Sequence, residues 1–257
     1  MLPESSHCRA RALLLSILSV ALLAGCAGNT TVEESPATDY DPWESLNRRV
    51  YNFNVAVDKA TLKPIAKGYK AVMPRFARRG ITNFFDNLTT PRSSLNNFLQ
   101  AKPKRGFKEL GRFLVNSTIG IGGLINITDI DGWARYDETF SQTFAVWGLP
   151  EGPYLMLPIL GPHSVLDATA LPLDYYTDLQ RSYKNTSVRD KLYFLRLIDA
   201  RHRLLVADKF LDESKDPYIA FREAYLQNRE YEIHDGDPPV EEDYYEFFDD
   251  EESSEVE

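Results

Sequence analysis

The sequence predicts a mainly helical protein. Apolar residues recur at the spacing of a helix face, and the alternation of apolar and polar residues that is typical of strands is scarce. Prolines and glycines interrupt the helical segments, so we expect short, broken helices. The chain of 257 residues contains no internal repeat.

Residues 1–25 predict a lipoprotein signal peptide. Residues 12–23 form an apolar run behind two arginines, and this run is too short to span a bilayer, which needs about 20 residues. The run ends in Leu-Ala-Gly before Cys26, the pattern at which lipoprotein signals are cleaved. We expect attachment of a diacylglycerol and an N-linked acyl chain such as palmitate to Cys26. The alternative is an ordinary signal with a chance cysteine.

Cys26 is better explained as an acylation site than as a disulfide partner, because Cys8 leaves with the signal. Ala27 follows at the position where an aspartate tends to retain Gram-negative lipoproteins in the inner membrane, so we expect the outer membrane. No later stretch holds 18 consecutive apolar residues, and no transmembrane helix is expected after the signal.

Charge and polarity divide the rest of the chain. Residues 26–40 are polar and predict a flexible tether, and residues 41–234 predict the folded domain. Residues 47–112 hold 15 basic and 3 acidic side chains, which indicates either a solvated face or contact with anionic lipid headgroups. Nucleic acid is not expected as a partner of an exported protein. Residues 235–257 hold 12 acidic and no basic side chains and predict a disordered tail.

The first helix is predicted to begin at Asp41-Pro42, with Asp41 as its cap. One of its faces is apolar. Its polar face is either solvated, or joins this helix to others, or lines a wet cavity. The last two are favoured because Tyr51 and Asn52, rather than lysine or glutamate, adjoin Phe53. The apolar stripe comprises Leu46, Val50, Phe53 and Val57, and the polar stripe comprises Asn47, Tyr51, Asn54 and Asp58.

A second clear helix is predicted over residues 103–119, with Phe107, Leu110 and Leu114 on one face. Three glycines within four positions then predict a flexible apolar loop or hairpin near 120–130. Such a segment should face a core, a lipid or a partner, because apolar surface is costly to expose to water.

Residues 148–167 are strongly apolar, yet their prolines exclude a long helix. They form either a buried irregular loop or a segment that dips into lipid. The residues expected to contact the membrane are Tyr154, Leu155, Met156, Leu157, Ile159 and Leu160. Helical patterns resume over 171–211, and Asp216-Pro217 predicts the start of a last helix that ends near Ile233.

No motif for catalysis or metal binding occurs. The chain lacks the Gly-x-Ser-x-Gly, phosphate-loop and His-Glu-x-x-His patterns. His163, Ser164 and Asp167 are close in sequence, but a triad is assembled in space and not by adjacency. We expect no enzyme, no metal, and no cofactor besides the acyl chains on Cys26.

Residues 41–231 resemble the MlaA/VacJ lipoproteins of Gram-negative outer membranes. Six motifs in the family's order, behind a lipoprotein signal, carry this resemblance. The motifs begin at Asp41, Gly80, Asn96, Arg112, Gly152 and Asp216, and the fourth runs on into the glycine loop. The sequence departs from the family pattern at Asn126, Ser141, Ala145, Leu166 and Ala170.

The resemblance implies a single ring-like domain in the inner leaflet of the outer membrane, facing the periplasm, with a central amphipathic channel. It implies that mislocalised glycerophospholipids leave the outer leaflet through this channel. A soluble periplasmic carrier then takes them to an inner-membrane complex driven by ATP, which maintains lipid asymmetry. A trimeric porin is the implied outer-membrane partner. In this setting we expect the glycine loop to gate the channel, through Asn116, Gly120, Ile121, Gly122, Gly123 and Leu124.

Two other functions stay open at this stage. The first is an envelope lipoprotein that scaffolds or binds porins without transporting lipid. The second is a phospholipase, for which no motif argues. Co-purifying lipid would favour transport, whereas release of free fatty acid by the pure protein would favour the phospholipase.

Overall fold

The computed structural model describes residues 40–130 and 132–238. The predicted signal peptide, residues 26–39 of the predicted tether and residues 239–257 of the predicted tail lie outside the described residues. The first half of the described chain contains α2 (Glu44–Ala60), α3 (Leu62–Val72), α4 (Arg75–Leu99), α5 (Pro103–Thr118), α6 (Ile127–Ile130) and α7 (Phe140–Val146). The second half contains β1 (Tyr154–Leu157), β2 (Gly161–Ser164), α8 (Val165–Thr177), the 3-10 helix η2 (Leu179–Ser182), α9 (Thr186–Leu204), α10 (Ala207–Glu213) and α11 (Pro217–Ile233).

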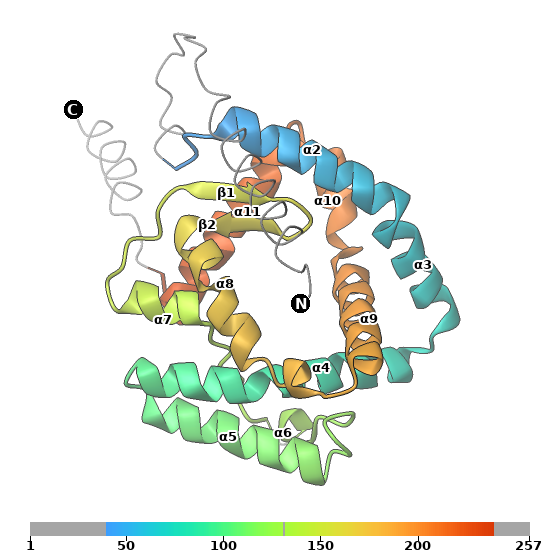
Figure 1. Ribbon diagram of the computed structural model, residues 1–257, viewed down its shortest axis with the longest axis vertical. Coiled ribbons are helices and arrows are strands. Elements are labelled where there is room, and N and C mark those ends of the chain that lie inside the picture. Colours follow the sequence, from blue (N-terminus) through green and yellow to red (C-terminus); the bar gives the residue numbers. More distant parts are fainter. Residues whose placement is uncertain (1–39, 131, 239–257) are drawn as a thin grey trace, which may run out of the picture. The chain divides into compact units, whose positions relative to one another are not determined.

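These elements contact one another in a closed circuit (Figure 1). α2 contacts α3, α3 contacts α9, and α9 contacts α4. From there α4 contacts α7, α7 contacts α8, and the hairpin of β1 and β2 leads from α8 back to α2. α5 packs along α4 outside this circuit. The prediction of a mainly helical fold is confirmed, and the central channel stays a prediction.

The buried side chains of the described residues are mostly polar. The apolar core is small: Tyr154, Met156 and Tyr218 pack together, with partly buried neighbours such as Val50 and Phe221. Most other buried residues carry amides, hydroxyls or charges, which need hydrogen-bond partners when they leave water. Many large apolar side chains are exposed instead. This distribution is the reverse of the one that water imposes on most folded domains.

α4 is longer than the sequence predicts. It runs for 25 residues and continues through Pro91, although prolines were expected to interrupt the helices. Proline removes one backbone hydrogen bond, but contacts with α5, α7 and α9 support the helix along its length. Within the described ranges, no helix combines the length and the apolarity that crossing a membrane requires.

The strands β1 and β2 form an antiparallel hairpin in a segment that the sequence predicts to be irregular. Tyr154 pairs with Ser164, and Leu157 pairs with Gly161. The tip turns tightly because Ile159 and Gly161 adopt left-handed backbone angles, φ 67° and φ 88°. Of the loop or hairpin predicted near residues 120–130, the structure has the loop: a turn followed by the short helix α6 occupies that segment.

Candidate functional site

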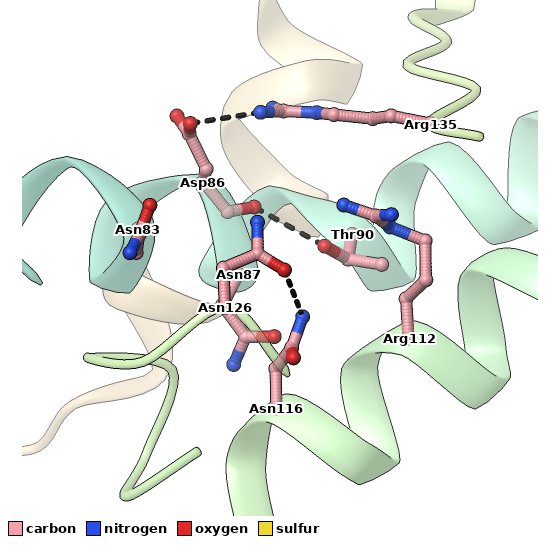
Figure 2. A pocket seen from close by; sticks show the side chains of 8 residues that line it. All are labelled: Asn83, Asp86, Asn87, Thr90, Arg112, Asn116, Asn126 and Arg135. Carbon is pink, nitrogen blue, oxygen red and sulfur yellow. Dashed lines mark hydrogen bonds and ion pairs between the residues drawn. The ribbon is translucent and has the colours of Figure 1, made fainter. Parts of the chain in front are cut away.

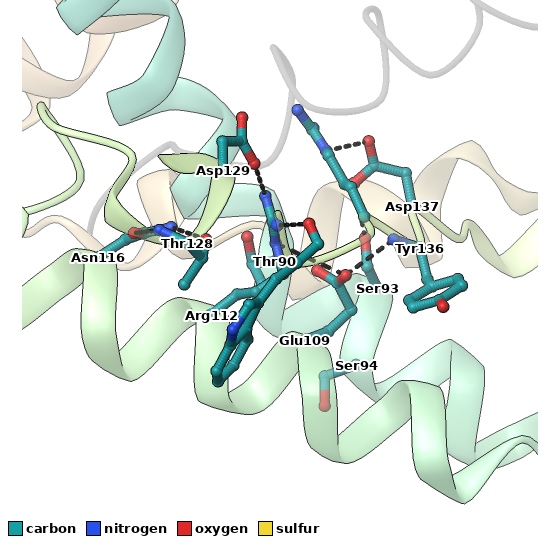
Figure 3. Close-up of polar contacts among 12 residues, drawn as sticks. Thr90, Ser93, Ser94, Glu109, Arg112, Asn116, Thr128, Asp129, Tyr136 and Asp137 are labelled. Atoms are coloured by element: carbon teal, nitrogen blue, oxygen red, sulfur yellow. Dashed lines mark hydrogen bonds and ion pairs between the residues drawn. The ribbon is translucent and has the colours of Figure 1, made fainter. Parts of the chain in front are cut away.

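Asn116 closes the turn between α5 and α6 with both ends of its side chain (Figures 2 and 3). Its Nδ2 donates to Asn126 Oδ1 at 3.1 Å and to Thr128 Oγ1 at 3.0 Å. Its Oδ1 accepts from the backbone N–H groups of Ile127 at 2.9 Å and Thr128 at 3.3 Å. Its carbonyl accepts from the Gly123 N–H at 2.8 Å. The predicted gating loop is therefore a hydrogen-bonded turn.

Two positions of this turn require glycine, because other atoms lie too close to leave room for a Cβ. A Cβ at Gly120 would lie 2.2 Å from the Ile125 carbonyl oxygen, and a Cβ at Gly123 would lie 2.6 Å from Asn87 Cβ. Gly123 and Gly122 also adopt left-handed angles, φ 91° and φ 68°, but a Cβ at Gly122 would meet nothing within 4 Å. The turn thus packs against the end of α5 and against α4. Its movement as a gate stays a prediction.

A buried charged seam joins α5 to α6 and to the segment before α7 (Figure 3). Arg112 donates to Asp129 at 2.8 Å and to the Trp133 carbonyl at 2.8 Å. Glu109 accepts from the Tyr136 N–H at 2.8 Å and lies 3.7 Å from Arg112. Burial raises the pKa of the Glu109 carboxyl, and the Tyr136 N–H and Arg112 oppose that rise. The sequence did not predict this seam, although Arg112 belongs to a motif of the resemblance.

A small polar cavity lies between α4 and the turn (Figure 2). Its volume of about 10 Å³ is space for roughly one water molecule. Asn87 Oδ1, which is buried and has no hydrogen-bond partner among the described residues, belongs to its lining. The cavity is lined by Asn83, Asp86, Asn87, Thr90, Arg112, Asn116, Asn126 and Arg135.

The opposite face of α5 and its turn is apolar and exposed. Phe107 and Leu114 are 66% and 54% exposed, and Ile121 of the turn is 63% exposed. The same surface includes Leu110, Ile119, Leu124 and Ile125. The apolar stripe predicted for this helix therefore points away from the protein, while its polar residues point inward.

The polar stripe of α2 also faces inward, toward the hairpin. Asn47 is fully buried; its Nδ2 donates to the Tyr154 carbonyl at 3.1 Å, and its Oδ1 accepts from the Met156 N–H at 2.9 Å. Asn54 makes the same pair of bonds two turns later, with the Leu157 carbonyl at 2.9 Å and the Ile159 N–H at 2.7 Å. Two asparagine amides thus bind β1 and the hairpin tip to α2.

The other residues of the α2 motif have separate environments. Tyr51 packs edge-on against Tyr218, with ring centroids 5.6 Å apart. Asp58 accepts from Arg201 of α9 at 2.7 Å. Asn52 and Phe53 are exposed, and 51% of the Phe53 surface is accessible to solvent.

Asp41 does not cap the first helix. α2 begins at Glu44 without a side-chain cap. Asp41 is instead buried and accepts hydrogen bonds from Asn47 at 2.8 Å, from the Tyr218 hydroxyl, and from Arg222 at 3.2 Å. These bonds join the start of the domain to α11 near its end.

Comparison with known proteins decides the family. The model of the MlaA lipoprotein family matches residues 39–232. This chain belongs to the MlaA lipoprotein family. The resemblance that the motifs predict is thereby confirmed.

The relatives named intermembrane phospholipid transport system lipoprotein MlaA include proteins of Haemophilus influenzae and Escherichia coli. The protein of Haemophilus influenzae is 30% identical over 233 residues, which cover 89% of this chain and 92% of that protein. The protein of Escherichia coli is 34% identical over 228 residues, which cover 86% and 88%. A solved structure described as "Structural basis for maintenance of bacterial outer membrane lipid asymmetry" is 34% identical with a TM-score of 0.66. It covers 75% of this chain and 98% of that one.

The hairpin of this MlaA family member corrects part of the predicted membrane contact. Tyr154 and Met156 are 1% and 2% exposed and lie in the core, so membrane contact is wrong for them. Strand alternation turns these two residues inward. Leu155 and Leu157 are half-buried. Ile159 and Leu160 at the tip are 66% and 63% exposed, and their contact with lipid stays a prediction. 

The residues considered for a catalytic triad form hydrogen bonds and an ion pair with the surrounding fold. His163 Nδ1 contacts the Gly161 carbonyl at 3.2 Å, and Ser164 caps α8 by accepting from the Asp167 N–H. Asp167 pairs with Arg229 at 3.2 Å and accepts from the Tyr225 hydroxyl. The described part of the chain holds no group of three or more His, Cys, Asp or Glu side chains that could bind a metal.

Proposed function

We propose that this chain is an outer-membrane lipoprotein that removes mislocalised glycerophospholipids from the outer leaflet and passes them through a channel to a soluble periplasmic carrier. The names of its relatives support this function at the level of phospholipid transport. The observation in the molecule that carries it is the inverted distribution of polarity, with exposed apolar faces and a buried polar interior.

The exposed apolar face of α5 and its turn suits a lipid environment. More than half of the side-chain surface is exposed to solvent at Phe107, Leu114, Ile119 and Ile121. Moving each such side chain from water into hydrocarbon gains roughly 1–2 kcal/mol. This free energy favours insertion into the inner leaflet and offsets the cost of displacing headgroups.

The start of α4 suits the boundary between headgroups and acyl chains. Phe76 is 79% exposed and lies between the exposed Arg75 and Arg79. Aromatic side chains at the acyl boundary with basic side chains at the headgroups are typical of interfacial helices. Each basic side chain near anionic lipid contributes about 1 kcal/mol.

The polar interior suits the passage of a headgroup. The face of α4 toward α7, α8 and α9 is polar. Thr82 donates to Asp199 of α9 at 2.9 Å, Arg92 lies 3.5 Å from Asp174 of α8, and Asn96 accepts from Thr143 of α7 at 2.8 Å. Such groups can replace the hydration of a phosphate or glycerol as it moves. We place the channel along this inward face.

Anchoring and partners complete the proposal. Acyl chains on Cys26 hold the chain in the inner leaflet with its domain facing the periplasm. A trimeric porin is its membrane partner, and the carrier delivers lipid to an inner-membrane complex driven by ATP. Mass spectrometry of the mature amino-terminal peptide tests the acylation, and site-specific photo-crosslinking from Ile159 or Ile121 tests the porin contact.

Deletion of the gene tests the transport function. We expect more phospholipid on the cell surface and greater detergent sensitivity, and restoration of both by the wild-type chain. The Leu114→Lys/Ile121→Lys chain should restore less than Lys184→Glu, a matched control at an exposed charged position. An unchanged cell surface in the deletion strain overturns the transport function.

A further inference from the structure

A cavity of about 710 Å³, open to solvent, lies between α3 and α10, apart from the charged seam of α5. Its volume falls within the range of roughly 300–1,000 Å³ that is typical of small-molecule sites. The lining combines both charges with two apolar residues: Lys63, Lys67, Lys70, Ala71, Leu205, Asp208, Lys209, Asp212 and Glu213.

One side of the lining is fixed by paired charges. Lys63 Nζ lies 2.9 Å from Asp208, which also accepts from Arg201 at 2.9 Å. Arg201 in turn binds Asp58 of α2 at 2.7 Å. These partly buried groups neutralise one another and hold α3, α9, α10 and α2 together, so this part of the cavity is preformed.

The rest of the lining offers charges of both signs. Lys67 and Lys70 are exposed, and no carboxylate of the described residues lies within 4.0 Å of either ammonium. They are three residues apart on α3 and therefore share one face. Across the cavity, Asp212 has no such cationic partner either, and Glu213 makes only a 3.7 Å, largely exposed contact with Lys209.

Exposed apolar side chains neighbour the lining residues in the sequence, and we take them as an apolar rim of the cavity. Val72 follows the lining residue Ala71 and is 84% exposed, and Val206 follows Leu205 and is also 84% exposed. Phe210 of α10 is 62% exposed. A ligand held by the lysines and carboxylates could therefore rest apolar groups on this rim.

We propose that this cavity binds the headgroup of a zwitterionic phospholipid, a phosphate diester that carries a primary ammonium. The phosphate lies between Lys67 and Lys70, the ammonium faces Asp212 and Glu213, and the acyl chains leave along the apolar rim. A purely anionic group would satisfy the lysines and leave the carboxylates without a cation. This inference rests on the proposed function and adds a headgroup site to it.

The test measures binding to the full acylated chain in a non-ionic detergent by isothermal titration calorimetry. The probes are dihexanoyl-phosphatidylethanolamine, dihexanoyl-phosphatidylglycerol and inorganic phosphate. Lys67→Glu/Lys70→Glu should weaken binding of both lipids by roughly tenfold or more, because two ionic contacts become repulsive. Asp212→Asn/Glu213→Gln should weaken only the phosphatidylethanolamine probe. Lys184→Glu/Lys191→Glu, a charge change of the same size at exposed sites outside the cavity, should leave all three affinities unchanged.

The inference is overturned if phosphatidylethanolamine does not bind, or if it binds equally to the wild type and both cavity variants. It is also overturned if inorganic phosphate or phosphatidylglycerol binds the wild type as tightly as phosphatidylethanolamine. Unchanged thermal unfolding of the variants confirms that they fold. Failure here leaves the deletion experiment intact, whereas a deletion strain with a normal surface removes the transport function without changing the binding result.

Discussion

Asn116→Ala is the substitution whose effect the hydrogen-bond geometry defines best. The side chain is 5% exposed and makes four hydrogen bonds across the turn between α5 and α6. Removing it leaves the Thr128 N–H without an acceptor and the Ile127 N–H with the Ile125 carbonyl at 3.2 Å, and Thr128 is 1% exposed. Because Thr128 is almost fully buried, its N–H cannot readily be solvated.

The expected cost follows from this count. A hydrogen bond contributes about 1 kcal/mol net, and a buried group left without its partner costs about 1–3 kcal/mol. Asn116→Ala should therefore lower the free energy of unfolding by about 3 kcal/mol. Asn83→Ala is the matched control, because Asn83 makes a single exposed bond of 3.3 Å to the Leu124 carbonyl. It should cost less than about 0.5 kcal/mol.

Thermal unfolding followed by circular dichroism in detergent micelles measures this difference. For a domain of this size, 3 kcal/mol corresponds to a Tm about 6–12 °C lower. If Asn116→Ala and Asn83→Ala unfold within about 1 °C of each other, the turn is not held by Asn116 and the reasoning is refuted.

Three further substitutions test other parts of the account. Gly123→Ala should lower the free energy of unfolding by about 2–3 kcal/mol, because the new Cβ meets Asn87 and the backbone is left-handed; thermal unfolding measures it. Glu109→Gln should stabilise the protein relative to the wild type, and increasingly so as the pH rises above the ordinary carboxyl pKa of 4.5. The pKa of Glu109 is raised in the folded state, so the folded wild type loses stability when this carboxyl ionises, whereas glutamine does not ionise. Tm measured against pH gives the difference. Leu114→Lys should reduce partitioning of the unacylated chain into vesicles by about tenfold or more, because a lysine is costly in hydrocarbon; flotation measures it.

Each of these has a control or a contradicting result. Gly122 also has a left-handed backbone, but a Cβ there would meet nothing within 4 Å, so Gly122→Ala should lower the free energy of unfolding by only about 1 kcal/mol. Equal losses for Gly122→Ala and Gly123→Ala would contradict the packing argument. A Tm difference between Glu109→Gln and the wild type that is constant from pH 4 to 8 would contradict the burial argument. Equal flotation of Leu114→Lys and Lys184→Glu would contradict lipid contact.

The limits of sequence reasoning are clearest at two identical dipeptides. Asp216-Pro217 and Asp41-Pro42 both predict a capped helix start. Asp216 does accept from the N–H groups of Tyr218 and Ile219, because capping is a local interaction. Asp41 instead binds a tyrosine and an arginine of α11, which lie about 180 residues later in the chain, and no local pattern reveals such partners.

The polar stripe of α2 shows a similar limit. Its spacing placed Asn47 and Asn54 on one line, and the structure places both against the hairpin. Their partners are backbone groups of β1 and of the hairpin tip, and a backbone carbonyl or N–H leaves no signature in the sequence. The hairpin itself was missed because its prolines masked the alternation that buries Tyr154 and Met156.

The central claim is that the outward apolar face of α5 and its turn lies in lipid. Nitroxide labels at Leu114 and Ile121, and at the charged control Lys184, can be compared in the acylated chain in bilayer nanodiscs by electron paramagnetic resonance. The account predicts that labels at Leu114 and Ile121 collide often with oxygen and are shielded from a water-soluble nickel complex. The label at Lys184 should collide often with the nickel complex and less often with oxygen. Labels at Leu114 and Ile121 that the nickel complex reaches as freely as it reaches Lys184 would contradict the account.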